Sequence, residues 1–182
     1  MAGKRVGVLA LQGGFAAHLR MLAELDVQGL EVRTPSELSG LDGLILPGGE
    51  STTMSIGVKR EELSRPLAEF VASGKPVLGT CAGMIMLDRD HLGLLEISTE
   101  RNAFGRQINS FETSLDLTAI GIEKLQAVFI RAPWVSEYSK QVQVLASVDN
   151  HPVAVIQDNI LAVAFHPELS DDLRLHQWII SQ

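Results

Sequence analysis

The sequence predicts an α/β domain in which helices flank a mixed, mainly parallel β-sheet. In the first half, short β-rich runs alternate with longer amphipathic segments, a rhythm that is typical of parallel strands joined by helices. In the second half, three β-rich runs follow one another with only short turns between them. This second pattern indicates an antiparallel extension of the sheet.

Length and composition limit the class of protein. The chain has 182 residues, of which 46% are hydrophobic and 20% are charged, so it is long enough to bury a core without a metal or a disulfide. Its single cysteine excludes an intrachain disulfide and favours a reducing compartment. The net charge of -7 argues against a nucleic-acid-binding surface, and the apolar runs are too short to span a bilayer. We expect a soluble, cytoplasmic protein with one domain over residues 1–182, which binds neither nucleic acid nor membrane.

The elements of the first half follow in order along the chain. Arg5–Leu11 is a continuous apolar run that ends at Gln12-Gly13-Gly14, as expected of a strand buried on both faces. Phe15–Asp26 carries apolar residues at helical spacing. The other expected elements are the strands Leu30–Arg33, Gly43–Leu46 and Pro76–Thr80 and the helices Arg65–Ser73 and Met84–Asp88.

The second half contains the antiparallel extension and a last helix. Asp-Asn pairs, which favour tight turns, separate three expected strands, Val142–Val148, His151–Gln157 and Ile160–Phe165. Ser170 is expected to cap a final helix, with Asp171 and Asp172 in its first turn, where a negative charge is favourable.

Cys81 lies in the sequence GTCAG, where an expected strand gives way to a helix. Small residues two positions before and after a nucleophile permit the tight turn of a nucleophile elbow. The start of a helix also favours the thiolate over the thiol. The alternative is an inert cysteine, since free cysteines are often buried for packing. The two flanking glycines favour the catalytic interpretation.

His166 and Glu168 lie in the sequence FHPE, which follows the last β-rich run. In an extended segment, side chains at i and i+2 point the same way, so both can face one site. The carboxylate would then fix the tautomer of the imidazole and stabilise the imidazolium. The alternative is a surface histidine beside a solvated glutamate. A metal site would have to recruit three further residues whose spacing fits no strong zinc pattern, Asp171, Asp172 and His176.

A third loop, Pro47–Thr52 (PGGEST), also follows an expected strand. Two successive glycines free backbone N–H groups to point at a ligand or at a developing oxyanion. A phosphate-binding loop would need a lysine where Glu50 stands, so that interpretation is rejected. Ser51 or Thr52 would also suit the cap of a helix.

The three loops all follow β-rich runs. Ligands of open α/β sheets gather at the carboxyl ends of the strands, so these loops are candidates for a common site. A cysteine, a histidine and a glutamate in one site indicate acyl transfer through a thioester.

These residues resemble the class I, or triad, glutamine amidotransferases, and in particular the branch of glutaminase subunits of two-protein pyridoxal 5′-phosphate synthases. The motifs GTCAG and FHPE indicate only a triad amidotransferase, whereas ERNAFGRQ and LALQG favour the vitamin B6 branch. The motifs span nearly the whole chain, at residues 9–13 (LALQG), 47–53 (PGGESTT), 79–83 (GTCAG), 100–107 (ERNAFGRQ), 129–133 (FIRAP) and 165–168 (FHPE).

The resemblance implies a three-layer, flavodoxin-like fold and the hydrolysis of L-glutamine to L-glutamate and ammonia. It assigns Cys81 as the nucleophile, His166 as the general base and Glu168 as the residue that orients His166. Main-chain amides near Gly49 and Ala82 would form the oxyanion hole. The positions implied to hold the glutamine substrate are Gly49, Glu50, Ser51, Arg101, Ile130 and Arg131.

The resemblance also implies a partner, a barrel-shaped pyridoxal 5′-phosphate synthase subunit. Gln12 would lie in the loop that faces this partner and would help to switch on the oxyanion hole. The chemistry needs no metal and no cofactor, because pyridoxal phosphate would be the product of the larger assembly. The chain departs from the family pattern between Cys81 and His91, where it is several residues shorter. Two alternatives stay open: the glutaminase of another triad amidotransferase, such as imidazole glycerol phosphate synthase, and a regulatory module that has lost its activity.

Overall fold

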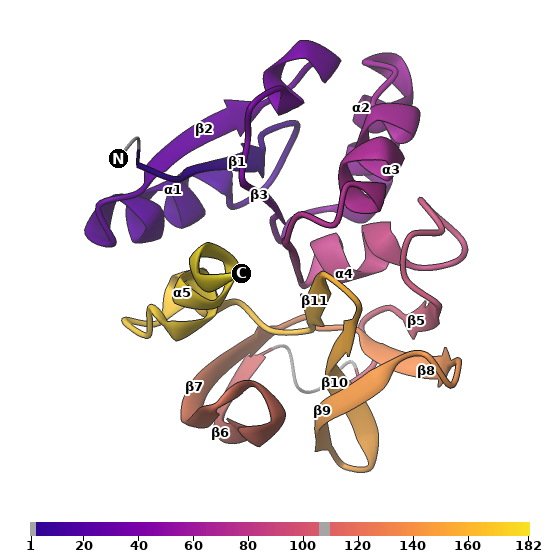
Figure 1. Cartoon of the computed structure of the whole chain (residues 1–182). Coiled ribbons are helices and arrows are strands. Elements are labelled where there is room, and N and C mark those ends of the chain that lie inside the picture. Colours follow the sequence, from indigo (N-terminus) through magenta and orange to yellow (C-terminus); the bar gives the residue numbers. More distant parts are fainter. Residues whose placement is uncertain (1–2, 106–109) are drawn as a thin grey trace.

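A seven-stranded sheet forms the centre of the computed structural model, which describes residues 3–105 and 110–182 (Figure 1). The strand order is β2-β1-β3-β4-β11-β10-β9. The first five strands are parallel, β10 is antiparallel to β11, and β9 is antiparallel to β10. The strands are β1 (Arg5–Leu9), β2 (Gln28–Val32), β3 (Gly43–Leu46), β4 (Val77–Thr80), β9 (Gln143–Val148), β10 (His151–Gln157) and β11 (Ile160–Val163).

The mixed, mainly parallel sheet confirms the predicted fold class. The order of its five parallel strands is the one found in flavodoxin-like sheets. Strands β3 and β10 have the predicted bounds. Strand β1 ends two residues earlier than expected, at Leu9.

Helices cover both faces of this sheet (Figure 1). Val6 pairs with Gly29 on one side and with Gly43 on the other, so all three face the same way. Gly29 lies against Leu22 of α1, and Gly43 lies against Ile179 of α5. Helices α1 (Phe15–Glu24) and α5 (Arg174–Ser181) therefore share one face. The other face is covered by α2 (Ser51–Arg60), α3 (Ser64–Ala72) and α4 (Ala82–Leu87).

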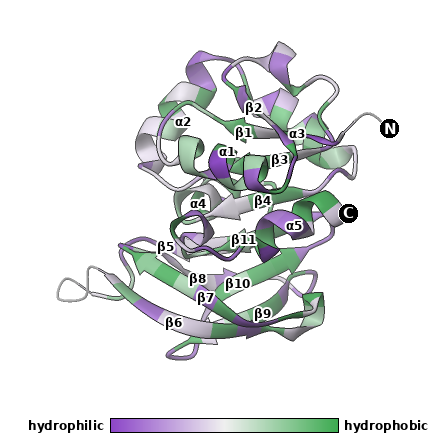
Figure 2. Cartoon of the chain, turned by 90° about the vertical axis from the view of Figure 1, so that its left-hand side faces the viewer, coloured by the Kyte–Doolittle hydropathy of each residue, from purple (hydrophilic) through white to green (hydrophobic). Residues whose placement is uncertain are grey.

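The central strands are buried because both faces of the sheet are covered. All four residues of β3, β4 and β11 are buried, as the continuous apolar runs predicted. In Figure 2 the strands in the middle of the molecule are mainly hydrophobic, whereas α1 and α5 carry hydrophobic and hydrophilic residues side by side. Among the described residues, no helix combines the length and the apolar character that crossing a membrane requires.

Two small antiparallel sheets, which the sequence did not predict, lie beside β9 and β10 (Figure 1). One pairs β5 (Ile97–Glu100) with β8 (Trp134–Tyr138), and the other pairs β6 (Ser110–Leu117) with β7 (Ile122–Ile130). Phe129 of β7 stacks on Phe111 with a centroid distance of 4.5 Å and also meets Phe165 at 5.5 Å. This aromatic contact joins the β6–β7 hairpin to the segment that carries His166.

Two helix caps suggested by the sequence are wrong. The last helix begins at Arg174 rather than after Ser170, because a 3₁₀ turn over Pro167–Leu169 comes first. Asp172 therefore lies outside the helix, where it pairs with Arg174 at 2.7 Å. The cap of α2 is the side chain of Glu50, which accepts hydrogen bonds from the backbone N–H groups of the second and third helical residues. Neither Ser51 nor Thr52 has that role.

Candidate active site

Cys81 stands at the turn between β4 and α4, as predicted. Its backbone has φ 49° and ψ -106°, a conformation that L-residues rarely adopt. Its N–H donates to the carbonyl of Val163 at 2.8 Å, which fixes the turn to the neighbouring strand. A side chain on Gly83 would collide with the backbone of Leu46, so glycine is required where α4 meets β3. The turn is thus both strained and tightly held, as expected of a nucleophile elbow.

His166 and Glu168 form the predicted pair. Nδ1 of His166 lies 2.7 Å from Oε1 of Glu168, and the backbone N–H of His166 donates to Val128 at 2.8 Å. The two residues flank the start of a 3₁₀ turn rather than lying on an extended strand. Glu168 is only 8% exposed, so the histidine faces a buried carboxylate and not a solvated one.

The pKa values of this pair are shifted in opposite directions. Burial alone lowers the pKa of His166, but its hydrogen bonds with Cys81 and Glu168 and the charges of these two groups outweigh that effect and raise the pKa to about 10. Burial alone raises the pKa of Glu168, but the hydrogen bond with His166 outweighs it and holds that pKa below its usual value. The pair therefore favours an imidazolium beside a carboxylate.

The predicted residues converge on a cavity of about 380 Å³. Cys81 and His166 line it together, and Glu168 lies behind His166. Ala82 and two residues that the sequence did not single out, Ile85 and Asn102, also line the cavity. All of the residues predicted to hold glutamine are in its wall: Gly49, Glu50, Ser51, Arg101, Ile130 and Arg131.

The glycine loop after β3 is in direct contact with the loop after β1. The N–H of Gly14 donates to the carbonyl of Gly48 at 2.9 Å, and the N–H of Glu50 donates to Oε1 of Gln12 at 2.7 Å. Gly13 has a φ of 96°, and a side chain there would collide with the carbonyl of Gly48. Gln12 does not line the cavity itself; it contacts the loop that does.

The carboxylate of Glu50 is engaged by its own helix. It accepts from the N–H groups of Thr52 at 3.1 Å and Thr53 at 2.8 Å, and also from the hydroxyl of Thr53. These hydrogen bonds, the backbone one from Thr53 first, lower the pKa of Glu50 to about 2.

Arg101 is held by a chain of side chains that the sequence did not reveal. One guanidinium nitrogen donates to the hydroxyl of Thr52 at 3.1 Å, and the other lies 3.3 Å from Nε2 of His91. Nδ1 of His91 lies 2.7 Å from the buried carboxylate of Asp88, which also accepts from Thr99. Because a carboxylate only accepts, His91 carries its proton on Nδ1 and offers a lone pair to Arg101. His91, in the short segment after α4, thus holds Arg101 in place.

Two further histidines lie behind Glu168, and both are fully buried. The sequence did not single out His18 of α1, and it offered His176 of α5 only as a ligand of an alternative metal site. Nδ1 of His18 lies 2.9 Å from Nε2 of His176, and its Nε2 lies 3.2 Å from the hydroxyl of Thr80. The sequence indicates these two histidines only by their position, since each is a single histidine on the apolar side of its helix. Because His176 is in the core and Asp172 pairs with Arg174, the alternative metal site with Asp171, Asp172 and His176 does not form.

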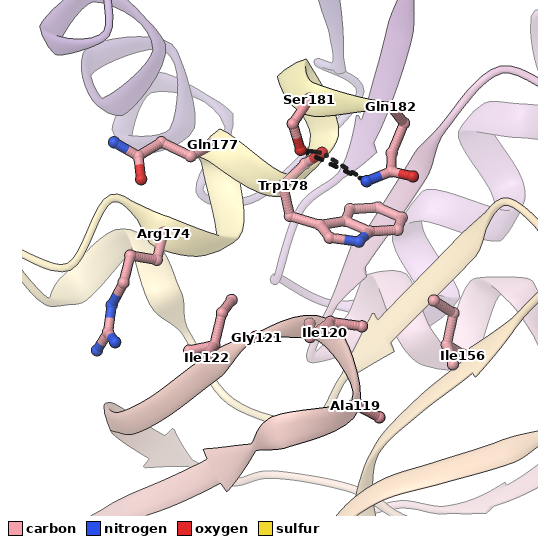
Figure 3. A pocket seen from close by; sticks show the side chains of 10 residues that line it. All are labelled: Ala119, Ile120, Gly121, Ile122, Ile156, Arg174, Gln177, Trp178, Ser181 and Gln182. Carbon is pink, nitrogen blue, oxygen red and sulfur yellow. Dashed lines mark hydrogen bonds between the residues drawn. The ribbon is translucent and has the colours of Figure 1, made fainter.

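A larger hollow, of about 590 Å³, lies between the 3₁₀ turn Thr118–Ile120, β10 and α5 (Figure 3). Its described lining includes Trp178 and Ile156 but no cysteine, histidine or carboxylate side chain. Its one cation, Arg174, is paired with Asp172 at 2.7 Å. Nucleophilic and acid–base groups are thus gathered at the Cys81 cavity and not here.

The fold and the site are those of one class of protein, the glutamine amidotransferases. A crystal structure described as a glutamine amidotransferase matches this chain with a TM-score of 0.91 and 42% identity over 97% of each chain. More specifically, the model of the SNO glutamine amidotransferase family matches residues 8–182, so the chain belongs to that family.

Relatives in this family resemble the chain over nearly its whole length. The pyridoxal 5′-phosphate synthase subunit PdxT of Carboxydothermus hydrogenoformans is 48% identical over 98% of this chain and 97% of its own length. The protein of the same name from Shouchella clausii is also 48% identical, over 97% of this chain and 93% of its own. The resemblance drawn from the motifs is confirmed at the level of the family.

Proposed function

We propose that this chain is the glutaminase subunit of a pyridoxal 5′-phosphate synthase, where it hydrolyses L-glutamine to L-glutamate and supplies the ammonia to a synthase subunit. The observation that carries the proposal is the convergence of Cys81 and the His166–Glu168 pair on one cavity lined by two arginines. The names of the whole-length relatives support the vitamin B6 branch over imidazole glycerol phosphate synthase. An intact thiol, imidazole and carboxylate also speak against a silent module.

In the first half of the reaction, Sγ of Cys81 attacks the side-chain carboxamide carbon of glutamine. The new C–S bond forms as the carbonyl oxygen becomes an oxyanion. The backbone N–H groups of Gly49 and Ala82 donate hydrogen bonds to this oxyanion. The C–N bond then breaks, and His166 gives a proton to the departing nitrogen, which leaves as ammonia. Glu168 holds the imidazole through Nδ1, so that Nε2 faces the reacting atoms.

In the second half, water cleaves the thioester. His166 takes a proton from the water as its oxygen bonds to the acyl carbon, the C–S bond breaks, and glutamate leaves with the thiolate restored. Arg101 and Arg131 supply positive charge to the α-carboxylate of the substrate, the group that guanidinium side chains recognise best. The cavity of about 380 Å³ is within the usual range for small ligands.

The partner is proposed to be the barrel-shaped synthase subunit that consumes the ammonia, with both proteins in the cytoplasm. The single cysteine of the chain fits that reducing compartment.

The experiment is a glutaminase assay that measures glutamate with and without the synthase subunit. Cys81→Ala is expected to abolish glutamate release and keep the fold, because it removes the only thiol of the chain. Cys81→Ser is the matched control: it keeps a binding-competent pocket but reacts very slowly, since an alcohol ionises far less readily than a thiol. Substantial glutamate release by the Cys81→Ala protein would overturn the mechanism.

A further inference from the structure

Two histidines lie buried behind the carboxylate that orients His166. His18 of α1 and His176 of α5 are fully buried, on the face of the sheet that these two helices share (Figure 1). Nε2 of His18 lies 3.4 Å from Oε2 of Glu168, and its Nδ1 lies 2.9 Å from Nε2 of His176. One oxygen of Glu168 thus faces His166, and the other faces His18.

The two carboxylate oxygens of Glu168 differ in their hydrogen bonding. Oε1 is bound by His166 at 2.7 Å, but Oε2 is buried and has no well-aligned hydrogen bond among the described residues. The polar groups on this side include Nε2 of His18 and, 3.2 Å from that nitrogen, the hydroxyl of Thr80. A buried carboxylate oxygen without a donor is costly, so the proton of His18 decides whether Glu168 stays in place.

The contacts select one arrangement of protons. Burial, the main cause in each case, lowers the pKa of His18 to about 4 and that of His176 to about 3, so each imidazole is neutral and has one N–H and one lone pair. If His18 carried its proton on Nδ1, its Nε2 lone pair would face the Glu168 carboxylate. His176 would then have to hold its own proton on Nδ1, which has no partner among the described residues.

The opposite arrangement avoids both costs. With the proton on Nε2 of His18, an N–H faces both Oε2 of Glu168 and the hydroxyl of Thr80, and the Nδ1 lone pair accepts from Nε2–H of His176. Only a bare acceptor on Nδ1 of His176 is left without a partner in the described part of the chain. In this arrangement His176 donates to His18, and the Nε2–H of His18 is directed toward Glu168 and Thr80.

We infer that His18 is a positioning residue for the glutaminase reaction: its Nε2–H faces Oε2 of Glu168 and keeps the other carboxylate oxygen on Nδ1 of His166. This inference rests on the proposed function, in which His166 moves the protons. His18 touches neither the cavity nor the substrate, because Glu168 lies between it and His166. His176 acts one step further away, by setting the tautomer of His18.

The kinetic test compares His18→Gln with His18→Asn. The amide nitrogen of glutamine reaches about as far as Nε2 of histidine, whereas that of asparagine reaches only as far as Nδ1. The proteins are assayed with the synthase subunit present. We expect His18→Asn to lower kcat about tenfold with an unchanged KM for glutamine, since the N–H that faces the buried carboxylate of Glu168 is lost. His18→Gln is expected to keep most of the activity.

The pH profile separates positioning from a merely structural role. If Glu168 is displaced in His18→Asn, the imidazolium of His166 loses stabilisation, and the basic limb of kcat/KM moves to lower pH. His18→Gln should keep the limb of the parent protein. Equal kcat values for the two variants, or an unmoved basic limb in an impaired His18→Asn protein, would overturn the inference.

A second measurement does not depend on activity or on the folding of a variant. Imidazole ¹⁵N chemical shifts of the unsubstituted protein report the tautomer of each of its five histidines. We expect His18 and His176 both to be neutral and protonated on Nε2 at pH 7. A proton on Nδ1 of His18 would overturn the inference. Absence of glutamate production by the unsubstituted protein together with the synthase subunit would instead overturn the proposed function and leave this tautomer result standing.

Discussion

At the scale of the residue, Cys81 shows how strain and reactivity share one position. A backbone conformation of this kind costs about 1–3 kcal/mol and persists only where the surroundings enforce it. Here the N–H bond to Val163 and the close approach of Gly83 to β3 enforce it. The turn exposes the thiol to the cavity while its backbone stays fixed, which suits a nucleophile that must meet a carbonyl carbon in one orientation.

His166 and Glu168 give the first prediction at this scale. His166→Asn is expected to lower kcat by about 10²–10⁴-fold, because the proton carrier is lost. Glu168→Gln is expected to cost less, because Glu168 orients and does not transfer. It also removes a negative charge that acts together with Cys81 to raise the pKa of His166, so that pKa falls and the basic limb of kcat/KM moves to lower pH. Steady-state rates from pH 6 upwards check both points, and a larger loss in Glu168→Gln than in His166→Asn would reverse the roles.

Arg101 gives the second prediction. Its guanidinium is fixed by Thr52 and by His91, and His91 is fixed by Asp88. Arg101→Ala is expected chiefly to raise the KM for glutamine, because a contact made equally to substrate and transition state is lost. Asp88→Asn is expected to raise KM less, by loosening His91. Arg65→Ala is the matched control, since that arginine is exposed and pairs with Glu69, an exposed residue of the same helix. A normal KM in Arg101→Ala would make Arg101 a structural residue.

At the scale of the element, the sequence predicted what is encoded locally. Apolar runs bounded by glycine marked β3 and β4, and the glycines around Cys81 marked the turn between β4 and α4. These signals need no knowledge of distant residues. The convergence of the loops followed from one general rule about the carboxyl ends of parallel strands, and the shared cavity agrees with it.

The elements that the sequence missed depend on contacts far along the chain. The β6–β7 hairpin is held by pairing and by the contact of Phe129 with Phe165, and exposed residues alternate along β6. His18 and His176 are 158 residues apart, so neither indicates the other in the sequence. The start of the last helix was misplaced because the 3₁₀ turn after His166 takes up the residues that resembled a cap.

At the scale of the whole molecule, the loops after β1 and β3 are joined by hydrogen bonds. Gln12 accepts from the N–H of Glu50, and Gly14 donates to the carbonyl of Gly48, so the loop after β1 sets the conformation of the peptides beside the cavity. Glycines at positions 13, 48 and 49 allow these peptides to turn at low steric cost. A partner that docks on the Gln12 loop would therefore act on the oxyanion hole without touching Cys81.

The last prediction follows from this contact. Ammonia released without an acceptor is wasted, so glutaminase activity is expected to be weak in the isolated chain and to rise with the concentration of the synthase subunit. The loss of one oxyanion donor costs about 10²–10³ in kcat, which is enough to keep the isolated chain nearly silent. Gln12→Ala removes the acceptor for Glu50 and is expected to lower the plateau of the stimulated rate, with Cys81→Ala as the zero-activity control. Full activity of the isolated chain, unchanged by the synthase subunit, would rule out gating and would make this protein a glutaminase that works alone.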